Sequence, residues 1–411
     1  MSAGSKEEIQ NQLNQESTTP NVVKVAIACQ GGGIHAAFEV GVLVEILENI
    51  QQQKIARQER FRLIGVSGTS AGALNALMVW YGLADKGGKA GSETEAIKKL
   101  ESFWDGFAAV NVAEKVLNRL SYSAFRAREL EIPWLGINAP ILNLNPRGAI
   151  VEVVTASLPV FGVRKEYYDL EELLNESCPE FESIDWPGQK TRLLVGATDV
   201  IHGIETVFDS NFNNKTGPTL DGWREQRPLT LHGVSASGTL PEFLPAQRVG
   251  DRCYWDGLYS LNPPIREFWI NTPEVPDEIW VLRINPQRAT EEPKSNSEIQ
   301  HRENELMGNL SLNKELDFIR HINGWALEGW LNPGFLGALY PRLGVKLRTI
   351  KMKQETADTL QYSSKFNRSG DFIKQLKKEG REVAQGWLNK WLNKKPEEEA
   401  DFSYPKDAGY D

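Results

Sequence analysis

Residues 61–72 read FRLIGVSGTSAG, and this stretch decides the fold. Phe61 to Val66 is a mostly apolar run, which predicts a strand buried on both faces of a sheet. Gly68-Thr69-Ser70-Ala71-Gly72 follows it, and Ala71 to Leu83 continues as an apolar helical segment. A Gly-x-Ser-x-Gly turn between a strand and a helix indicates a nucleophile elbow, although an ordinary turn with a capping serine fits the pentapeptide alone.

The same pattern occurs nearer the N-terminus. Val22 to Ala28 (VVKVAIA) predicts a buried strand, and Ile34 to Gln53 has apolar residues at helical spacing, with its glutamates mostly off the apolar stripe. Leu193 to Thr198 and Ile279 to Ile284 predict two further buried strands. Successive strand-turn-helix units predict a three-layer α/β/α fold with a mainly parallel central sheet.

The glycines Gly31, Gly32 and Gly33 lie between the first strand and its helix. Their N–H groups are candidates for an oxyanion hole, because backbone donors fixed in a shared cavity stabilise the charge that develops during acyl transfer. The alternative is a dinucleotide-binding loop, because Gly31 to Ala36 nearly fits Gly-x-Gly-x-x-Gly. The acidic residue expected about 20 positions further on is absent, which disfavours that alternative.

Composition narrows the choice of function. The chain has 411 residues and a formal net charge of -9, which disfavours a nucleic-acid binder. The three cysteines, Cys29, Cys178 and Cys253, fit no metal or redox spacing and are expected to be free thiols. The histidines show no paired spacing typical of a metal site. No apolar run reaches the ~18 residues of a spanning helix, which leaves contact with a membrane surface open.

A third group of motifs makes the pattern specific. Trp255-Asp256-Gly257-Leu258 is preceded by Ala236-Ser237-Gly238-Thr239-Leu240-Pro241 and followed by Asn262-Pro263-Pro264. The order of the motifs along the chain resembles the patatin-like phospholipase family: a glycine run, then Gly-x-Ser-x-Gly, then Ala-Ser-x-x-x-Pro, then Asp-Gly. The resemblance covers roughly Val22 to Ile284.

The resemblance implies a serine lipid acyl hydrolase of the phospholipase A or lysophospholipase kind. Ser70 would be the nucleophile and Asp256 its general base, without an intervening histidine and without a cofactor or metal. Gly31, Gly32 and Gly33 would form the oxyanion hole, while Gly68 and Gly72 would give the elbow its tight turn. A carboxylic ester of a membrane lipid would be the substrate, cleaved through an acyl-enzyme.

Two departures from the family pattern bear on activity. His35 stands where the family usually has arginine or lysine, so a constant positive charge is missing there. Leu258 stands where the family usually has alanine or glycine, and its bulk is expected to narrow the pocket beside Asp256. Two alternatives follow: a Ser-His-Asp esterase or thioesterase for soluble esters that uses His301 or His321, and a catalytically weak lipid-binding protein.

The resemblance also sets the expected domain boundaries. We expect a disordered polar tail at 1–21, a patatin-like catalytic domain at 22–395 and an acidic flexible tail at 396–411. Within the domain the core motifs occupy 22–284, and 301–395 forms a C-terminal helical extension. Its amphipathic segment, Asp371 to Trp391, is expected to pack on the sheet.

Three surface features complete the expectations. Arg288 to Arg302 predicts an exposed charged loop, in which His301 would lie. The aromatic-rich stretch Ile322 to Leu343 is either core or a lid that meets lipid. With no apparent secretory signal, the protein is expected in the cytoplasm, with transient contact to a membrane surface, and the sequence does not indicate its oligomeric state.

Overall fold

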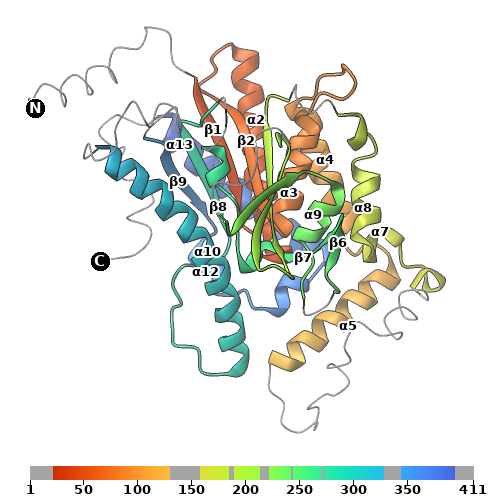
Figure 1. Ribbon diagram of the computed structural model, residues 1–411. Helices are drawn as coiled ribbons and strands as arrows, with labels where there is room; N and C mark the ends of the chain where they lie inside the picture. Colours follow the sequence, from red (N-terminus) through yellow and green to blue (C-terminus); the bar gives the residue numbers. More distant parts are fainter. Residues whose placement is uncertain are drawn as a thin grey trace, which may run out of the picture.

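The computed structural model describes residues 22–129, 158–184, 189–212, 222–241, 244–269, 272, 274–327 and 344–393. The tails predicted at 1–21 and 396–411 lie outside these residues, as does most of the aromatic-rich stretch, from 328 to 343. Figure 1 shows a central sheet with helices on both faces.

The strands of the sheet are β1 (Val23–Cys29), β2 (Phe61–Thr69), β3 (Arg192–Asp199), β4 (Ile204–Asp209), β5 (Arg224–Pro228), β6 (Gln247–Val249), β7 (Arg252–Asp256), β8 (Glu278–Arg283) and β9 (Lys346–Lys351). Their main order is β5-β4-β3-β2-β1-β8-β9, and β7 pairs with both β3 and β6. The run from β3 through β2, β1 and β8 to β9 is parallel, whereas β4 and β7 are antiparallel to β3. The predicted mainly parallel sheet is therefore confirmed.

The α-helices are α2 (Ala37–Ala56), α3 (Ala71–Leu83), α4 (Glu93–Phe107), α5 (Val112–Glu129), α7 (Lys165–Tyr168), α8 (Leu170–Ser177), α9 (Leu231–Ser237), α10 (Asn296–Leu327), α12 (Gln354–Ala357) and α13 (Gly370–Leu392). The 3-10 helices are η1 (Gly33–Ala36), η3 (Leu158–Phe161), η4 (Phe181–Ser183), η6 (Gly257–Tyr259), η7 (Arg266–Phe268) and η8 (Ser363–Phe366).

Alternation along the strands separates two apolar cores. Val25 and Ile27 of β1 pack in one core, together with side chains of α2, α3, α4 and α13. Ala26 and Ala28 face the opposite core, which α10 covers. Because successive side chains of a strand point to opposite faces, a strand that is apolar throughout must be covered on both sides. The three-layer architecture follows from this requirement.

The predicted amphipathic helix at 371–391 is confirmed as α13, and it packs against α2 beside the sheet. Two glycines permit the close approach: a Cβ at Gly41 would lie 1.9 Å from the carbonyl oxygen of Lys377, and one at Gly380 would lie 1.9 Å from that of Phe38. At the C-terminal end of the helix, Trp391 packs on Trp280 of β8, with ring centroids 5.4 Å apart.

Three expectations need correction. The segment 301–395 is not wholly helical, because residues 346–351 form β9, which extends the parallel sheet beside β8. The loop predicted at 288–302 ends early, since α10 begins at Asn296 and includes His301. Glu39, expected off the buried stripe of its helix, is fully buried and accepts a hydrogen bond of 3.0 Å from Nδ2 of Asn75.

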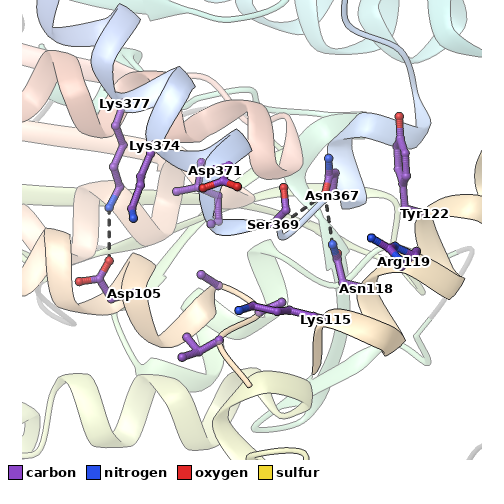
Figure 2. Close-up of a pocket in the computed structure, with 15 residues that line it drawn as sticks. Asp105, Lys115, Asn118, Arg119, Tyr122, Asn367, Ser369, Asp371, Lys374 and Lys377 are labelled. Atoms are coloured by element: carbon purple, nitrogen blue, oxygen red, sulfur yellow. Dashed lines mark hydrogen bonds and ion pairs between the residues drawn. The ribbon is translucent and has the colours of Figure 1, made fainter. Parts of the chain in front are cut away.

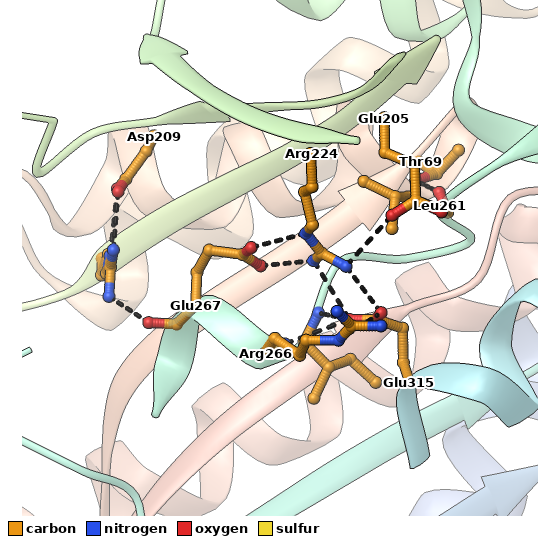
Figure 3. Close-up of polar contacts among 10 residues, drawn as sticks. Thr69, Glu205, Asp209, Arg224, Leu261, Arg266, Glu267 and Glu315 are labelled. Carbon is orange, nitrogen blue, oxygen red and sulfur yellow. Dashed lines mark hydrogen bonds and ion pairs between the residues drawn. The ribbon is translucent and has the colours of Figure 1, made fainter. Parts of the chain in front are cut away.

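A buried ion cluster fixes the segment that follows Asp256 (Figure 3). Arg224 of β5 donates to both carboxylate oxygens of Glu267, at 2.7 and 2.6 Å, and to both of Glu315 in α10, at 2.7 and 3.1 Å. Glu315 also accepts from the backbone N–H groups of Ile265 and Arg266. The cluster therefore joins β5, η7 and α10 through charged groups that satisfy one another.

Candidate active site

The turn at Ser70 has the geometry of a nucleophile elbow. Ser70 has φ 56° and ψ -131°, in the left-handed region that non-glycine residues rarely adopt. Gly68 and Gly72 allow the chain to fold this tightly, because a Cβ at either position would lie within 2.4 Å of a backbone oxygen. Strain of this kind is retained mainly at functional sites. The tight strand-to-helix turn predicted at Ser70 is therefore present.

Strand pairing places Asp256 beside the elbow. Thr69, the last residue of β2, pairs with Gly196 of β3, and Asp256, the last residue of β7, pairs with the next residue, Ala197. Strand β7 thus pairs with the part of β3 that extends beyond the end of β2, and it runs antiparallel to β3. Two segments far apart in sequence deliver Ser70 and Asp256 to the same edge of the sheet.

The carboxyl group of Asp256 is buried and only partly satisfied. Oδ1 accepts a hydrogen bond of 2.8 Å from the N–H of Leu258, whereas Oδ2 has no hydrogen-bond partner within the described residues. Burial raises the pKa of Asp256 to about 7, while the Leu258 N–H, the Ser70 hydroxyl and the Lys365 charge act in the opposite direction. A carboxylate with this pKa and a free oxygen can accept a proton near neutral pH.

The three glycines of the first loop have different roles. The N–H of Gly31 donates to Oδ1 of Asn262 at 2.5 Å, so it is already engaged and does not face a substrate. Gly32 and Gly33 stand at the start of η1, where N–H groups have no partner inside the helix. Gly33 has φ 60°, a conformation that suits glycine. Only Gly32 and Gly33 thus remain candidate oxyanion donors.

Two side chains that hold the site had no role assigned from the sequence. Ser237 accepts from the N–H of Ser70 at 2.9 Å and donates to the carbonyl of Gly196 at 2.6 Å, which ties the elbow to β3. Asn262 anchors the glycine loop through Gly31. Ser237 and Asn262 both lie in motifs that carry the family resemblance. The sequence therefore marks their positions, but it does not reveal the hydrogen bonds that they make.

A buried lysine also lines the site, and no motif marks it. Lys365 of η8 is 6% exposed, and its Nζ donates to the side chains of Asn304 and, at 3.5 Å, Asn285. Its carbonyl oxygen would lie 2.6 Å from a Cβ at Gly33, so η8 packs directly on the glycine loop. Burial lowers the pKa of Lys365 to about 8, partly offset by Glu305 and Asp256. Lys365 therefore lines the same small cavity as the two candidate oxyanion donors.

The departures at positions 35 and 258 have structural explanations. His35 is buried, its Nε2 lies 2.7 Å from Oγ of Ser364, and burial together with Lys365 lowers its pKa. It is therefore neutral, and Lys365 provides the positive charge. Leu258 packs towards α10 at Gly308, where an added Cβ would lie 3.0 Å from its Cδ1. The absence of a side chain at Gly308 accommodates the bulk of Leu258.

Two adjoining cavities open at Ser70. The smaller, about 30 Å³, is lined by residues that include the three loop glycines, Ser70, Asp256 and Lys365. The larger, about 420 Å³, is mainly apolar, and its lining includes Ser70, Leu74, Leu117, Phe125 and Phe366. A narrow end that holds Ser70, Asp256 and Lys365, joined to a wider apolar end, suits a substrate with one polar reacting group and one long apolar chain. Leu258 is among the residues that line the smaller cavity.

A third cavity, about 600 Å³, lies between α5 and α13 and shares Asn118 with the apolar cavity (Figure 2). Asn118 donates to Oδ1 of Asn367 at 3.2 Å. Six charged residues line this cleft: Asp105, Lys115, Arg119, Asp371, Lys374 and Lys377. Four of the six are cations, whereas the whole chain carries a net charge of -9.

The histidines do not complete a catalytic triad. All five lie in the described part of the chain, and none of them lines the two cavities at Ser70. Nε2 of His301 lies 3.2 Å from Glu305, and Nδ1 of His321 lies 2.7 Å from the carbonyl of Asp317. Within the described residues there is also no group of three His, Cys, Asp or Glu side chains that could hold a metal ion.

An α/β/α sheet that carries a serine at a strained strand-to-helix elbow, next to a buried carboxylate and an apolar cavity, is the arrangement of an ester hydrolase. The family model for patatin-like phospholipases matches residues 27–269, more than half of the chain. The chain therefore belongs to the patatin-like phospholipase family and is a hydrolase of carboxylic esters.

Comparison with solved structures gives only distant similarities. VipD from Legionella pneumophila is 12% identical, with 88% of this chain and 68% of VipD covered and a TM-score of 0.31. The type III effector ExoU is 13% identical, with 92% of this chain and 55% of ExoU covered and a TM-score of 0.29. ExoU of Pseudomonas aeruginosa in complex with SpcU is 12% identical, with 91% of this chain and 53% of ExoU covered and a TM-score of 0.27. No curated protein sequence matches the chain.

Proposed function

We propose that the protein hydrolyses carboxylic esters of membrane lipids, with Ser70 as nucleophile and Asp256 as general base. The observation that carries this proposal is the buried Asp256 carboxylate, whose Oδ2 lacks a hydrogen bond within the described residues, in the cavity that Ser70 also lines. The Ser70 hydroxyl lowers the pKa of Asp256, and the two side chains line the same small cavity. No histidine stands between them in this cavity.

The reaction proceeds in two halves. Oγ of Ser70 attacks the ester carbonyl carbon while its proton moves to Asp256, and the carbonyl electron pair becomes an oxyanion. The intermediate collapses, the C–O bond to the alcohol breaks, and Asp256 returns the proton to the leaving oxygen. Water, which gives a proton to Asp256, then attacks the acyl carbon; the C–O bond to Ser70 breaks, the fatty acid leaves, and Asp256 returns the proton to Oγ of Ser70.

The oxyanion is stabilised by the N–H groups of Gly32 and Gly33 together with the ammonium group of Lys365. These donors are held in place before the reaction by the packing of η8 on the glycine loop, so little reorganisation is needed. Lys365 keeps its protons throughout. It takes the place of the charge that His35 does not carry.

The apolar cavity supports a lipid substrate. Its volume of about 420 Å³ and its lining by Leu74, Leu117, Phe125 and Phe366 suit an acyl chain that leaves the carbonyl at Ser70. We propose a phospholipase A or lysophospholipase activity with transient contact to the bilayer. Placement in the cytoplasm stays a prediction from the sequence.

The test is fatty-acid release from phospholipid vesicles by the wild type, Ser70→Ala and Asp256→Asn. Both variants are expected to lose at least about 10⁴-fold in kcat, because a nucleophile and its base act as one unit. Ser123→Ala, an exposed serine on α5, is the matched control and retains wild-type turnover. Unchanged release by Ser70→Ala would overturn the proposal.

A Ser-His-Asp esterase is the second candidate, and the geometry disfavours it. His301 lies in α10 and pairs with Glu305, and His321 bonds its own helix. His301→Ala and His321→Ala are therefore expected to keep activity. Loss of turnover in either variant, with Asp256→Asn still active, would favour that candidate.

A further inference from the structure

An exposed apolar surface lies on α5, the helix that also lines the acyl cavity. Val112, Val116 and Leu120 are 78%, 52% and 63% exposed and follow one another at intervals of four residues, which places them along one face of the helix. Val160 and Phe161 of η3 are 84% and 70% exposed. We call these five residues the α5 surface. Figure 1 shows α5 projecting from the body of the molecule.

The two parts of the α5 surface, on α5 and on η3, are held together by direct contacts. Nδ2 of Asn111 donates to the carbonyl of Gly162 at 2.9 Å, just after η3, and Leu158 of η3 packs with Leu117 of α5 in a small apolar cluster. Arg164 donates to Glu114 of α5 at 2.7 Å, which holds the two segments in register. The exposed apolar side chains of η3 therefore extend the stripe of α5.

The helix presents three faces with different chemistry. Its inner face, with Leu117, Ser121 and Phe125, lines the apolar cavity that begins at Ser70. A second face, with Lys115 and Arg119, lines the basic cleft against Lys374 and Lys377 of α13 (Figure 2). The third is the apolar stripe. A helix with an apolar stripe flanked by basic residues is typical of segments that lie in the headgroup region of a bilayer.

We propose that the α5 surface docks on a bilayer that contains anionic lipids and that lipid enters the acyl cavity along the inner face of the same helix. This deepens the proposed function and rests on it for the entry of substrate. The apolar stripe enters the headgroup boundary, and Lys115, Arg119 and Lys374 contact lipid phosphates. These cations also offset, locally, the repulsion that a chain with net charge -9 meets at an anionic membrane.

The test measures binding apart from catalysis. Full-length protein carrying Ser70→Ala is sedimented with vesicles of phosphatidylcholine alone, or of phosphatidylcholine mixed with phosphatidylglycerol. Adding Val116→Asp and Leu120→Asp should weaken binding to both vesicles by more than about tenfold, since apolar burial is lost. Adding Lys115→Glu and Arg119→Glu should weaken binding to the anionic vesicles alone, by at least about 30-fold, and abolish its dependence on salt.

Controls separate docking from folding and from catalysis. Ile55→Asp, at a residue 77% exposed near the end of α2, should bind vesicles like the parent. With Ser70 restored, Val116→Asp/Leu120→Asp should hydrolyse a soluble short-chain ester at the wild-type rate while losing activity on vesicles. If both double variants still bind vesicles like the parent, the proposal is overturned. It is also overturned if sedimentation velocity shows that Val116→Asp/Leu120→Asp abolishes self-association of the protein while vesicle binding is unchanged. An inactive wild type that still binds through α5 would refute the proposed function alone.

Discussion

At the scale of single residues, the site balances two buried charges of opposite sign. Burial alone disfavours both the Asp256 carboxylate and the Lys365 ammonium, which raises the pKa of the first and lowers that of the second. Each charge partly offsets the shift of the other. A base with a pKa of about 7 and a cation with a pKa of about 8 leave a narrow range in which both have the required charge.

This range predicts a bell-shaped pH profile. The rate kcat/KM should rise through pH about 7, because protonated Asp256 cannot accept the Ser70 proton, and fall above about 8 as Lys365 loses its charge. Lys365 faces Glu305, Asp256 and His35, and His35 stays neutral over this range. Initial rates of hydrolysis of a soluble ester, measured over a range of pH, report both the acid and the alkaline limb of this profile.

Variants of Lys365 separate a catalytic cation from a structural one. Lys365→Met should lower kcat by about 10²-fold with little change in KM and move the acid limb to higher pH, because the charge that lowers the pKa of Asp256 is gone. Lys365→Arg should keep much of the rate and move the alkaline limb upward, since arginine stays protonated. A Lys365→Met enzyme with an unchanged pH profile would assign the residue a packing role only.

The sequence reveals some of these residues and not others for a physical reason. Ser70 lies in a short local motif whose turn requires particular residue types, so its position can be predicted, whereas Asp256 was assigned through the resemblance to the family. Lys365 is an ordinary lysine between Ser364 and Phe366, and only the three-dimensional packing of η8 on Gly33 brings it to the site. The engagement of Gly31 by Asn262 is likewise a long-range contact that no local pattern reports.

At the scale of elements, the inner face of α5 sets the size of the acyl cavity. Leu117→Trp should fill part of the cavity of about 420 Å³ and shift preference from long to short acyl chains, because added volume excludes the distal methylenes. A series of soluble esters of increasing chain length measures the shift as a ratio of kcat/KM values. Ser123→Trp, exposed on the same helix, is the control. The same chain-length profile in both variants would place the acyl chain elsewhere.

Regular elements were predictable where periodicity was strong. The strands β1, β2, β3 and β8 are mostly apolar runs, and consecutive residues in each of them are buried, as predicted. Strand β9, Lys346–Lys351, contains three charged residues and no apolar run, within a region that was expected to be helical. Its place at the edge of the sheet depends on pairing with β8. Pairing between distant segments leaves little trace in local sequence.

At the scale of the whole molecule, the Arg224 cluster joins strand β5 to η7 and to α10, the helix that covers one face of the sheet. Glu315→Gln should lower the free energy of unfolding by roughly 3–5 kcal/mol, because Arg224 keeps its buried charge but loses one of its carboxylate partners. Urea titration followed by tryptophan fluorescence measures the change. Glu172→Gln, which breaks the exposed Lys165–Glu172 pair, should change it far less, because water screens the attraction between exposed charges. Equal effects of the two variants would contradict a structural role for the cluster.

The central claim, that Ser70 is the nucleophile and Asp256 its only side-chain base, is tested most directly by covalent labelling with a fluorophosphonate probe followed by peptide mapping. We predict a single adduct on Ser70 in the wild type, formed at the wild-type rate in His301→Ala and lost in Ser70→Ala. Asp256→Asn should label at least about 10³-fold more slowly, because the Ser70 proton then has no acceptor. An adduct on another residue, or labelling of Asp256→Asn at the wild-type rate, would contradict the dyad.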